Sequence, residues 1–542
     1  MKKNTIKRTV AAALFALSFV CGQVQALPAV QQDIRTAGKI TGRSTLLDNG
    51  KSKYVTVFAI NDLHGTVEED IAGKNPGIAK LAEVISELRE QNPESLFLSA
   101  GDNYQGSALS NLSKGKVVSD FFKAAGLNAS TIGNHEFDWG DDMLSTWQQD
   151  GGFTFIAANI IYKPTGKLPE WCRPYQMFRV GGHLIAVIGV ATEDTVFTAA
   201  KDKIQDYTFT DPAEAVRKTL RSVQAVYPVE ACIVLSHIGS HDNRLSPGNA
   251  VTATAGEELE KICRIDGVNA VITGHSHEFV KAKSNEVDVV QAANYGRAVS
   301  KIQLKFNTDG LVRVRSDVID VAKVKNEVTP DSAVTALVSS YKQQYGAELG
   351  QKVAFVEQEL SHEENVPNVT PLGYVIATAM KNAYGTDMAV TNGGGLRKTI
   401  KAGTLTMNDM WELIPFDNTG VVVRVKGADL KKIIDHGINS VGFRAGQFAG
   451  GKVYYTNGGA EGTRVKRIVL DDGREVADDT EYTVVVNDFM FDGGDRYDMI
   501  KPAAVSADNT FKPMRTAIVE QLQKMGTISK TWAEIPQVLI AE

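Results

Sequence analysis

Short apolar runs alternate with stretches of helical spacing through the first half of the chain. Tyr54–Ile60 and Ser95–Ala100 are apolar and rich in strand-forming residues, whereas Ile78–Asn92 and Val117–Ala125 carry apolar residues at helical spacing. This alternation of strand and helix predicts an α/β fold for this half. Further apolar runs that end in polar residues lie at Thr131-Ile132, Ala231–Leu235 and Ala270–Thr273.

A hairpin and a helix follow before the second half begins. The runs Val299–Phe306 and Leu311–Val318 flank a turn at Asn307–Gly310, which predicts an antiparallel hairpin. Asp331 to Tyr345 is then expected to form a helix, because Asp331 follows Pro330 and can cap the first turn. We interpret this helix as a linker, with a second α/β domain beginning near residue 350.

A polar cluster follows each predicted strand of the first half. Ligand sites in α/β sheets gather beyond the carboxyl ends of strands, so we expect the clusters to converge on one rim. A single cluster is better explained as a turn or a packing histidine, but five clusters in this order indicate a site. They contain five of the nine histidines of the chain. The candidate residues are Asp62, His64, Asp102, Asn134, His135, Asp138, His237, His275 and His277.

Seven of these residues carry side chains that bind metal. Two carboxylates, one amide and four imidazoles suit a pair of divalent ions such as Zn²⁺, Mn²⁺, Co²⁺ or Mg²⁺. One carboxylate must bridge if the ions lie roughly 3.5–4 Å apart, as in two-metal hydrolytic sites. Such a pair lowers the pKa of a bridging water and neutralises phosphoryl oxygens. The residue types therefore favour a two-metal hydrolytic site.

The N-terminus is typical of a secretory signal. The apolar run Val10–Val20 is too short to span a membrane comfortably, and Val24-Gln25-Ala26 resembles a cleavage site. We therefore expect a signal peptide over residues 1–26, cleavage after Ala26, and a periplasmic or secreted protein without a stable membrane anchor. Cys21 fits a lipoprotein signal poorly. The basic residues that precede the apolar run are Lys2, Lys3, Lys7 and Arg8.

Composition is that of a soluble enzyme. The 542 residues are 43% hydrophobic and 23% charged, and the net charge of −6 becomes about −10 once residues 1–26 are removed. An acidic protein has no general attraction for a nucleic acid polymer or an anionic membrane. Three cysteines remain, and an exported protein allows one disulfide, for which Cys232 with Cys263 is the pair we expect. The third is Cys172.

The clusters together resemble a known signature. Asp62-x-His64, Gly101-Asp102, Gly133-Asn134-His135-Glu136, His237 and Gly274-His275-x-His277 are similar to the calcineurin-like metallophosphoesterases. In the second half, three further motifs resemble the C-terminal domain of 5'-nucleotidases, which include bacterial UDP-sugar hydrolases and cyclic-nucleotide phosphodiesterases. These motifs are Asn392-Gly-Gly-Gly-Leu-Arg397, Pro415-Phe416-Asp417-Asn418 and Phe489…Gly493-Gly494-Asp495.

The resemblance implies a domain organisation and a metal site. It implies a four-layer α/β/β/α metallophosphoesterase domain over residues 50–325, a linker helix over 326–348 and an α/β substrate-binding domain over 349–542. It assigns Asp102 to both ions as the bridging ligand, and it makes His135 and Asp138 a catalytic dyad. Glu136 is expected to support the site without binding metal. One ion is implied to bind Asp62, His64 and His277, and the other Asn134, His237 and His275.

The second domain is implied to bind the substrate. Phe416 and Phe489 match a pair of aromatic residues that stack on both faces of a nucleobase. Outside such motifs, isolated phenylalanines would be better explained as core residues. Arg397 matches an arginine that reaches phosphate or the rim of the pocket. The positions implied to bond ribose or base are Asn392, Asn418 and Asp495.

One departure from the family affects the substrate. Relatives that bind a nucleoside monophosphate often carry two arginines before the glycine-rich motif, and simple counting places His362 and Val366 there. The acidic pair Glu363-Glu364 would repel phosphate. The resemblance therefore leaves the kind of phosphoester open.

Three other histidines are not expected to bind metal. We interpret His436 as a C-terminal cap because it ends a predicted helix before Gly437. His241 follows His237 by four residues, but Gly239 between them argues against a helical metal pair. His183 lies in a turn and is expected to have no function.

The leading hypothesis is a dinuclear metal phosphohydrolase of the 5'-nucleotidase type, in which metal-bound hydroxide attacks phosphorus. A 2',3'-cyclic nucleotide, a nucleotide sugar or a sugar phosphate is the alternative substrate. A non-catalytic nucleoside-binding surface protein fits less well, because every expected ligand is present. The expected partner is a small phosphoester, and the expected assembly is a monomer or homodimer.

Overall fold

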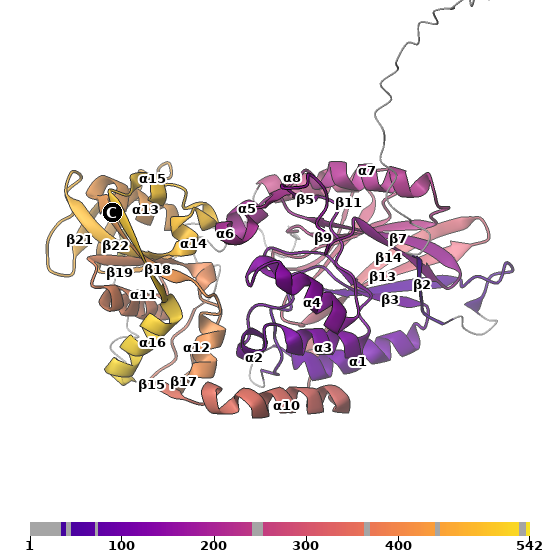
Figure 1. The fold of residues 1–542 in the computed structure, drawn as a ribbon, viewed down its shortest axis with the longest axis horizontal. Coiled ribbons are helices and arrows are strands. Elements are labelled where there is room, and N and C mark those ends of the chain that lie inside the picture. Colours follow the sequence, from indigo (N-terminus) through magenta and orange to yellow (C-terminus); the bar gives the residue numbers. More distant parts are fainter. Residues whose placement is uncertain are drawn as a thin grey trace, which may run out of the picture.

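The computed structural model describes residues 34–39, 45–70, 74–240, 253–362, 369–438, 445–529 and 538–541. The predicted signal segment over residues 1–26, His241, Glu363, Glu364 and Val366 lie outside these ranges. Figure 1 shows two lobes, an N-terminal one coloured indigo to pink and a C-terminal one coloured orange to yellow.

Two sheets form the centre of the N-terminal lobe. One has the strand order β1-β6-β7-β9-β10-β12-β11, and the other has the order β14-β13-β2-β3-β4. The strands of the first sheet are β1 (Ile34–Ala37), β6 (Tyr175–Val180), β7 (His183–Ala191), β9 (Ala231–His237), β10 (Ala270–Ile272), β11 (Phe279–Ser284) and β12 (Val287–Ala292). Those of the second are β2 (Tyr54–Ile60), β3 (Ser95–Ser99), β4 (Ala129–Ser130), β13 (Ala298–Asn307) and β14 (Gly310–Asp320). A separate pair consists of β5 (Ile160–Tyr162) and β8 (Tyr207–Phe209).

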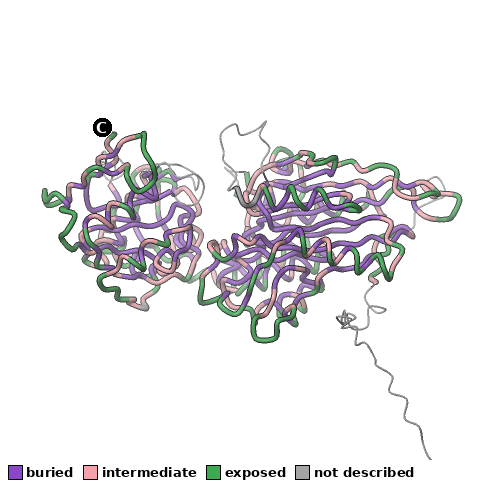
Figure 2. The backbone as a smooth tube through the Cα atoms, turned by 90° about the horizontal axis from the view of Figure 1, so that it is seen from above, coloured by how far each residue is buried: buried purple, intermediate pink, exposed green. Residues whose placement is uncertain are grey.

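The two sheets pack face to face, with helices on their outer faces. In β2, Val57 and Ala59 contribute to the core between the sheets, whereas Phe58 and Ile60 face the outer helices. Strands covered on both faces are apolar at nearly every position, which explains the continuous apolar runs in the sequence. Figure 2 shows these strands as buried. The result is the expected four-layer α/β/β/α arrangement.

The outer helices differ between the two faces. Helices α1 (Gly77–Gln91) and α3 (Lys116–Ala125) cover the second sheet, and α7 (Pro212–Gln224) and α8 (Ala253–Cys263) cover the first. The remaining helices of this lobe are α2 (Ala108–Leu112), α4 (Asp142–Gly151), α5 (Thr195–Thr198), α6 (Lys201–Ile204) and α9 (Val321–Val324).

The sequence located these elements closely. Strand β2 has the predicted bounds, and α1 and α3 lie within one residue of theirs. The predicted hairpin is present as β13 and β14. Asp331 caps α10 (Ser332–Leu349), because its Oδ1 accepts a hydrogen bond from the Val334 amide at 2.8 Å. The strand before Asn134 is β4, which ends at Ser130, directly before the expected run Thr131-Ile132.

The C-terminal lobe is a second α/β unit, as expected. Its central sheet has the order β19-β16-β22-β18-β23, with α11 and α16 packed on one face and α13 on the other. The strands of this lobe are β15 (Lys352–Val356), β16 (Met388–Asn392), β17 (Gly403–Thr406), β18 (Thr419–Lys426), β19 (Gly446–Ala449), β20 (Gly451–Tyr455), β21 (Val465–Leu470), β22 (Glu481–Asn487), β23 (Ser506–Pro513), β24 (Thr527–Ile528) and β25 (Leu539–Ala541). The helices are α11 (Pro371–Tyr384), α12 (Met407–Leu413), α13 (Gly427–Gly437), α14 (Asp488–Phe491), α15 (Ile500–Ala503) and α16 (Met514–Met525).

Helix α10 connects the lobes and packs against the N-terminal one. Val334 and Tyr341 belong to the same apolar cluster as α1 and α3, and the Tyr341 hydroxyl donates to Asp120 at 2.8 Å. Further along the boundary, Arg496 of the C-terminal lobe forms an ion pair with Asp194 of the N-terminal lobe at 2.9 Å. The exact domain limits remain predictions.

The expected disulfide is wrong. Cys232 and Cys263 are both free thiols, buried in the apolar cluster between the first sheet and helices α7 and α8. Cys172 is also a buried free thiol. In this cluster the cysteines serve as small apolar side chains. Within the described ranges, no helix has the length and apolar character needed to cross a bilayer.

The packing between the sheets gives a stability prediction. Phe178 on β6 is fully buried in the core between the sheets. Phe178→Ala should lower the free energy of unfolding by about 3–5 kcal/mol, because it leaves a cavity that the rigid sheets cannot fill. Urea unfolding followed by circular dichroism measures this loss. Val226→Ala is the control, since Val226 is 65% exposed, and equal stability of the two variants would contradict the role of this core.

Candidate active site

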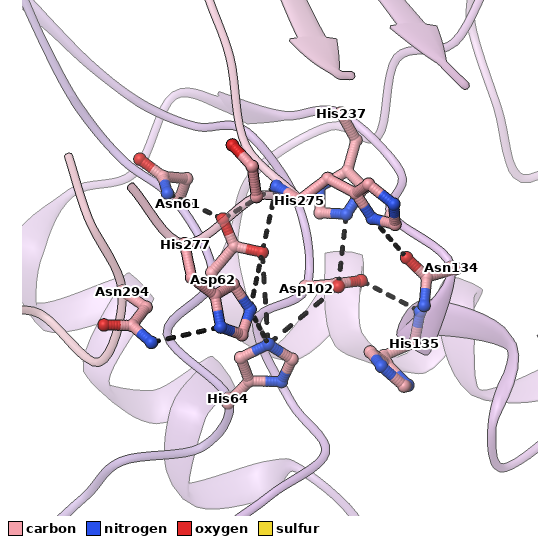
Figure 3. A network of polar contacts seen from close by, with 12 residues as sticks. Asn61, Asp62, His64, Asp102, Asn134, His135, His237, His275, His277 and Asn294 are labelled. Carbon is pink, nitrogen blue, oxygen red and sulfur yellow. Dashed lines mark hydrogen bonds and ion pairs between the residues drawn. The ribbon is translucent and has the colours of Figure 1, made fainter. Parts of the chain in front are cut away.

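The polar clusters converge as the sequence predicted. Asp62 and His64 follow β2, Asp102 follows β3, and Asn134 follows β4 of one sheet. Figure 3 shows the side chains of these residues grouped together. His237 ends β9, and His275 and His277 follow β10 of the other sheet. Two groups result that could each hold a metal ion: Asp62 with His64 and His277, and Asp102 with His237 and His275.

The spacing of the ligand atoms fits metal ions. His64 Nε2 lies 3.0 Å from His277 Nε2, and Asp62 Oδ1 lies 3.9 Å and 3.5 Å from these two nitrogens. In the second group, His237 Nε2 lies 3.1 Å from Asp102 Oδ2. Two ligands bound tetrahedrally at about 2.0–2.2 Å are separated by roughly 3.4 Å, so these distances suit a shared ion. Asp102 Oδ2 is also 3.9 Å from His64 Nε2, which places it between the groups.

The protonation of two of the four imidazoles agrees with metal binding, whereas in His237 the effect of burial is outweighed by the charge of Asp102, which raises the pKa of His237 to about 10. Burial and the nearby charge of Arg397 lower the pKa of His64 well below its usual range, and burial with the neighbouring His237 lowers the pKa of His275 to about 4. Both rings are therefore neutral and can offer a lone pair. His237 Nδ1 donates to the Ala100 carbonyl at 2.7 Å, which leaves Nε2, at 3.1 Å from Asp102 Oδ2, as the nitrogen that faces the candidate site. A metal ion could bind between this nitrogen and the Asp102 carboxylate.

Five of the seven ligand candidates have left-handed backbone. Their φ angles lie between 47° and 73°, a region that residues other than glycine seldom adopt. Such strain is concentrated at functional sites, where the surrounding structure maintains it. The five residues are Asp62, His64, Asp102, His275 and His277.

Glu136 connects two of the site's loops, as expected of a residue that does not bind metal. Its buried carboxylate accepts hydrogen bonds from the backbone amides of Asp102, Asn103 and Gly133 at 2.7–2.8 Å. Gly133 is needed here because a Cβ at this position would lie 2.1 Å from Asp102 Oδ1. The neighbouring Asn134 Oδ1 lies 3.1 Å from His275 Nδ1, which brings Asn134 to the second group.

His135 and Asp138 form the expected pair. His135 and Asp138 are three residues apart, and the 3-10 helix over His135–Phe137 brings their side chains to the same side of the chain. His135 Nδ1 lies 2.8 Å from Asp138 Oδ2. Burial disfavours the charged imidazole, but the charges of Asp138 and Asp102 outweigh it and raise the pKa of His135 to about 9. The His135 amide also donates to Asp102 Oδ1 at 2.9 Å. The dyad is therefore attached to the candidate metal site through Asp102.

One cavity of about 620 Å³ joins this site to the C-terminal lobe. Its lining includes Asp102, Asn134, His135, Asp138, His275 and His277, together with all six residues predicted to bind substrate: Asn392, Arg397, Phe416, Asn418, Phe489 and Asp495.

Two of these residues approach the N-terminal half of the site directly. The Phe416 ring stacks on the His135 ring, with centroids 5.4 Å apart and 29° between the planes. Arg397 Nη2 lies 3.5 Å from His64 Nε2. Side chains from the two lobes therefore meet at the dyad.

The glycine-rich motif that contains Asp495 is shaped by close packing. The Phe489 ring lies so close to Gly494 that a Cβ on Gly494 would be 2.4–2.5 Å from three ring atoms. Asp495 has left-handed backbone, and its Oδ2 accepts a hydrogen bond from Asn392 Nδ2 at 2.6 Å. Motifs far apart in the sequence thus form one wall of the cavity.

The interpretation of His436 as a cap is wrong. His436 does lie in the last turn of α13, but its buried ring bonds to Glu461 and donates through Nε2 to the Asp495 carbonyl at 3.0 Å. It therefore supports Asp495. His183 supports the fold away from the site: its ring stacks on Phe306, lies within hydrogen-bond distance of Glu230 and donates to the Ser52 carbonyl.

Sequence reasoning also missed residues that support the cavity. Arg515 is buried, stacks on Trp411 and donates to the Phe416 carbonyl at 3.2 Å and to Asp417 at 2.9 Å. Asn294 Nδ2 lies 3.1 Å from His277 Nδ1. No motif marked either residue, because their partners are distant in the sequence.

His362, at one of the positions where relatives carry arginine, does not line the cavity. Its buried ring lies 2.8 Å from Thr370 Oγ1 and donates to the Gly393 carbonyl at 3.0 Å. Gly393 begins the glycine-rich motif before Arg397. His362 thus fixes this loop and adds no cation to the described lining.

Comparison with known proteins agrees with this architecture. Residues 55–279 match the calcineurin-like phosphoesterase family, and residues 351–502 match the 5'-nucleotidase C-terminal domain. The chain is 28% identical over 460 residues to Endonuclease YhcR of Bacillus subtilis, a match that covers 80% of this chain and 37% of that protein. It thus spans little more than a third of this longer relative.

Two other relatives match over most of both chains. A 5'-nucleotidase of Vibrio cholerae is 27% identical over 509 residues, which cover 86% of this chain and 89% of the relative. The crystal structure of a 5'-nucleotidase precursor from Thermus thermophilus superposes with a TM-score of 0.78 at 25% identity, over 90% of this chain and 99% of that one. The chain therefore belongs to the 5'-nucleotidase family, which joins a calcineurin-like phosphoesterase domain to a 5'-nucleotidase C-terminal domain.

Proposed function

We propose that this protein is a metal-dependent phosphohydrolase that releases phosphate from nucleotides with the help of two divalent ions. The observation that carries the proposal is one cavity, whose lining includes members of both ligand groups, the dyad and the six substrate candidates. The Vibrio cholerae relative is named a 5'-nucleotidase, which supports a nucleotide as the substrate.

Asp102 is the ligand that we assign to both ions. Its carboxylate lies between the groups, 3.9 Å from His64 and 3.1 Å from His237. When bound, the ions would activate a water molecule as the nucleophile and neutralise the phosphoryl oxygens. The complete assignment is Asp62, His64, Asp102 and His277 for one ion, and Asp102, Asn134, His237 and His275 for the other.

His135 is assigned to the leaving oxygen or a phosphoryl oxygen. Its Nδ1 is held by Asp138, so Nε2 is the nitrogen left to face the substrate. A carboxylate that fixes one ring nitrogen orients the other, as in other carboxylate–histidine pairs. The dyad would thus hold or move a proton at Nε2 while the leaving group departs.

The C-terminal lobe is assigned to the nucleoside. Phe416 and Phe489 both line the cavity, and we assign them to stacking on the base. Stacking tolerates different bases because every base has a π-face. Asn392, Asn418 and Asp495 are assigned to ribose or base. Arg397, close to His64, is assigned to phosphate.

A phosphodiester is the second candidate substrate. The described lining of the cavity has four lysine or arginine residues and seven aspartates. Of these four cations only Arg397 is assigned to phosphate, so beyond the ions the site offers little positive charge for a dianionic terminal phosphate, and substrates with less charge per phosphate, such as 2',3'-cyclic nucleotides, can compete with it. The YhcR relative, named an endonuclease, adds an oligonucleotide to the substrates to be tested, although we expect no polymer to bind. Nucleotide sugars and sugar phosphates complete the panel.

We propose export to the periplasm or outside the cell, with cleavage after Ala26. The support is the sequence of residues 1–26 and the precursor named among the solved structures. N-terminal sequencing of the protein recovered from the periplasmic fraction would test it, and an intact residue 1–26 segment would refute cleavage.

Asp102→Ala should lower metal content and abolish phosphate release, because it removes the ligand assigned to both ions. Metal analysis by mass spectrometry and a phosphate assay with added Mn²⁺ measure the two effects. Asp309→Ala is the matched control, since Asp309 lies in an exposed turn. Two bound ions and normal turnover in Asp102→Ala would refute the bridging role.

His135→Ala should retain metal but reduce kcat by roughly 10²–10⁴-fold, as expected for loss of an acid–base group. Asp138→Asn should reduce kcat less, because the imidazole remains but is no longer oriented by a carboxylate. Steady-state kinetics and metal analysis of both variants measure these two effects. An unchanged kcat in His135→Ala would remove the dyad from the mechanism.

The Phe416→Ala/Phe489→Ala variant should raise KM for AMP and for a 2',3'-cyclic nucleotide. Each stacking contact contributes about 1–3 kcal/mol, and the two need not add. p-Nitrophenyl phosphate has no nucleoside and should change much less. Phe355→Ala is the control, because Phe355 is 42% exposed on the surface. Equal losses for all three substrates would show that the two rings serve only packing.

A further inference from the structure

Arg496 reaches from the C-terminal lobe to a short helix of the N-terminal lobe. It ends the 3-10 helix Gly494–Arg496, directly after the substrate candidate Asp495. Its Nη2 donates to Asp194 Oδ1 at 2.9 Å, and its Cζ lies 4.6 Å from the centre of the Phe197 ring. Asp194 is the residue before α5 and Phe197 lies within it, and Figure 1 shows α5 at the boundary between the lobes. One arginine of the substrate motif therefore contacts α5 at two points.

This contact is stronger than an ordinary surface ion pair. The side chain of Asp194 is only 10% exposed, and charged pairs with a nearly buried member are costly to break. The guanidinium also lies over an aromatic ring, which adds a cation–π attraction. The loss of Arg496 would therefore weaken the attachment of α5 to the C-terminal lobe.

Helix α5 ends at a residue that contacts a candidate metal ligand. The Thr198 carbonyl accepts a hydrogen bond from Asn134 Nδ2 at 3.2 Å, and Asn134 Oδ1 lies 3.1 Å from His275 Nδ1. An amide nitrogen is a donor and an amide oxygen is an acceptor, so the bond to Thr198 leaves the oxygen free to face a metal ion. The Thr198 carbonyl thus determines which atom of Asn134 points to the second group.

The two ends of α5 are joined to each other. The Asp194 carbonyl accepts hydrogen bonds from the Phe197 amide at 2.8 Å and from Thr198 Oγ1 at 3.2 Å. A helix of four residues has little stability of its own and depends on its contacts with the rest of the protein. A shift of Asp194 would therefore be passed to Thr198, and from Thr198 to Asn134.

We propose that Arg496 is a positioning residue that acts through α5 to orient Asn134 toward the second metal-binding group. This inference rests on the proposed two-metal function and adds to it a route by which the substrate-binding lobe supports the metal site. Residues that orient metal ligands typically contribute about 10- to 100-fold to metal affinity or activity.

Arg496→Ala should weaken the binding of one of two Mn²⁺ ions by about 10-fold, the lower end of that range. Electron paramagnetic resonance of free Mn²⁺ measures both binding steps without turnover. Asn134→Ala identifies the affected step, because it removes the ligand itself. Arg496→Lys should recover part of the loss, since it keeps the charge but not the planar group. Arg424→Ala is the matched control, because Arg424 forms an exposed ion pair in the same lobe.

The variant that combines Arg496→Ala with Asn134→Ala separates positioning from a general loosening of the fold. If Arg496 acts through Asn134, adding Arg496→Ala to Asn134→Ala should cause no further loss of Mn²⁺ affinity. Unchanged affinity in Arg496→Ala, equal weakening of both ions, or a further loss in the combined variant would overturn the inference. If the unaltered protein binds two Mn²⁺ ions but hydrolyses no phosphoester, the proposed function fails, while these titrations still decide the role of Arg496.

Discussion

The left-handed backbone of the ligand candidates is the constraint on which the site depends. Five residues at the ends of β2, β3 and β10 hold φ angles of 47–73°, and each such residue costs up to about 1–3 kcal/mol. The chain keeps them because the strands that precede them are buried on both faces and cannot shift. The large core between the two sheets thus maintains a few strained turns whose side chains converge.

Loops from distant parts of the sequence are joined by buried polar groups. Glu136 connects the Asp102 loop to the Asn134–His135 loop through three backbone hydrogen bonds. In the C-terminal lobe, Arg515 and His436 support Phe416 and Asp495 in the same way. Groups that face the cavity are therefore positioned by buried partners. A binding site needs such supporting residues to hold its side chains in a fixed geometry.

The two lobes divide the proposed chemistry. The N-terminal lobe contributes carboxylate, amide and imidazole side chains, which suit metal and phosphate, and the C-terminal lobe contributes aromatic rings and amides, which suit a nucleoside. Their contact at Phe416 and His135 places a stacking surface directly beside the dyad. Both sets of side chains line one cavity, which is the arrangement that the proposed nucleotide substrate requires.

The sequence alone predicted most strands and helices and the candidate metal-binding side chains. Buried strands appear as continuous apolar runs, and the candidate side chains appear as polar clusters directly after them, so both signals are local in the chain. It identified Asp62, His64 and the other cluster residues for this reason. It misjudged His436, Cys232 and Cys263, and overlooked Arg515, because the surroundings of these side chains are formed by residues distant in the sequence. Only the tertiary structure decides which side chains meet, since hydrogen bonds and close packing act over a few ångströms in space and leave no periodic trace in the sequence.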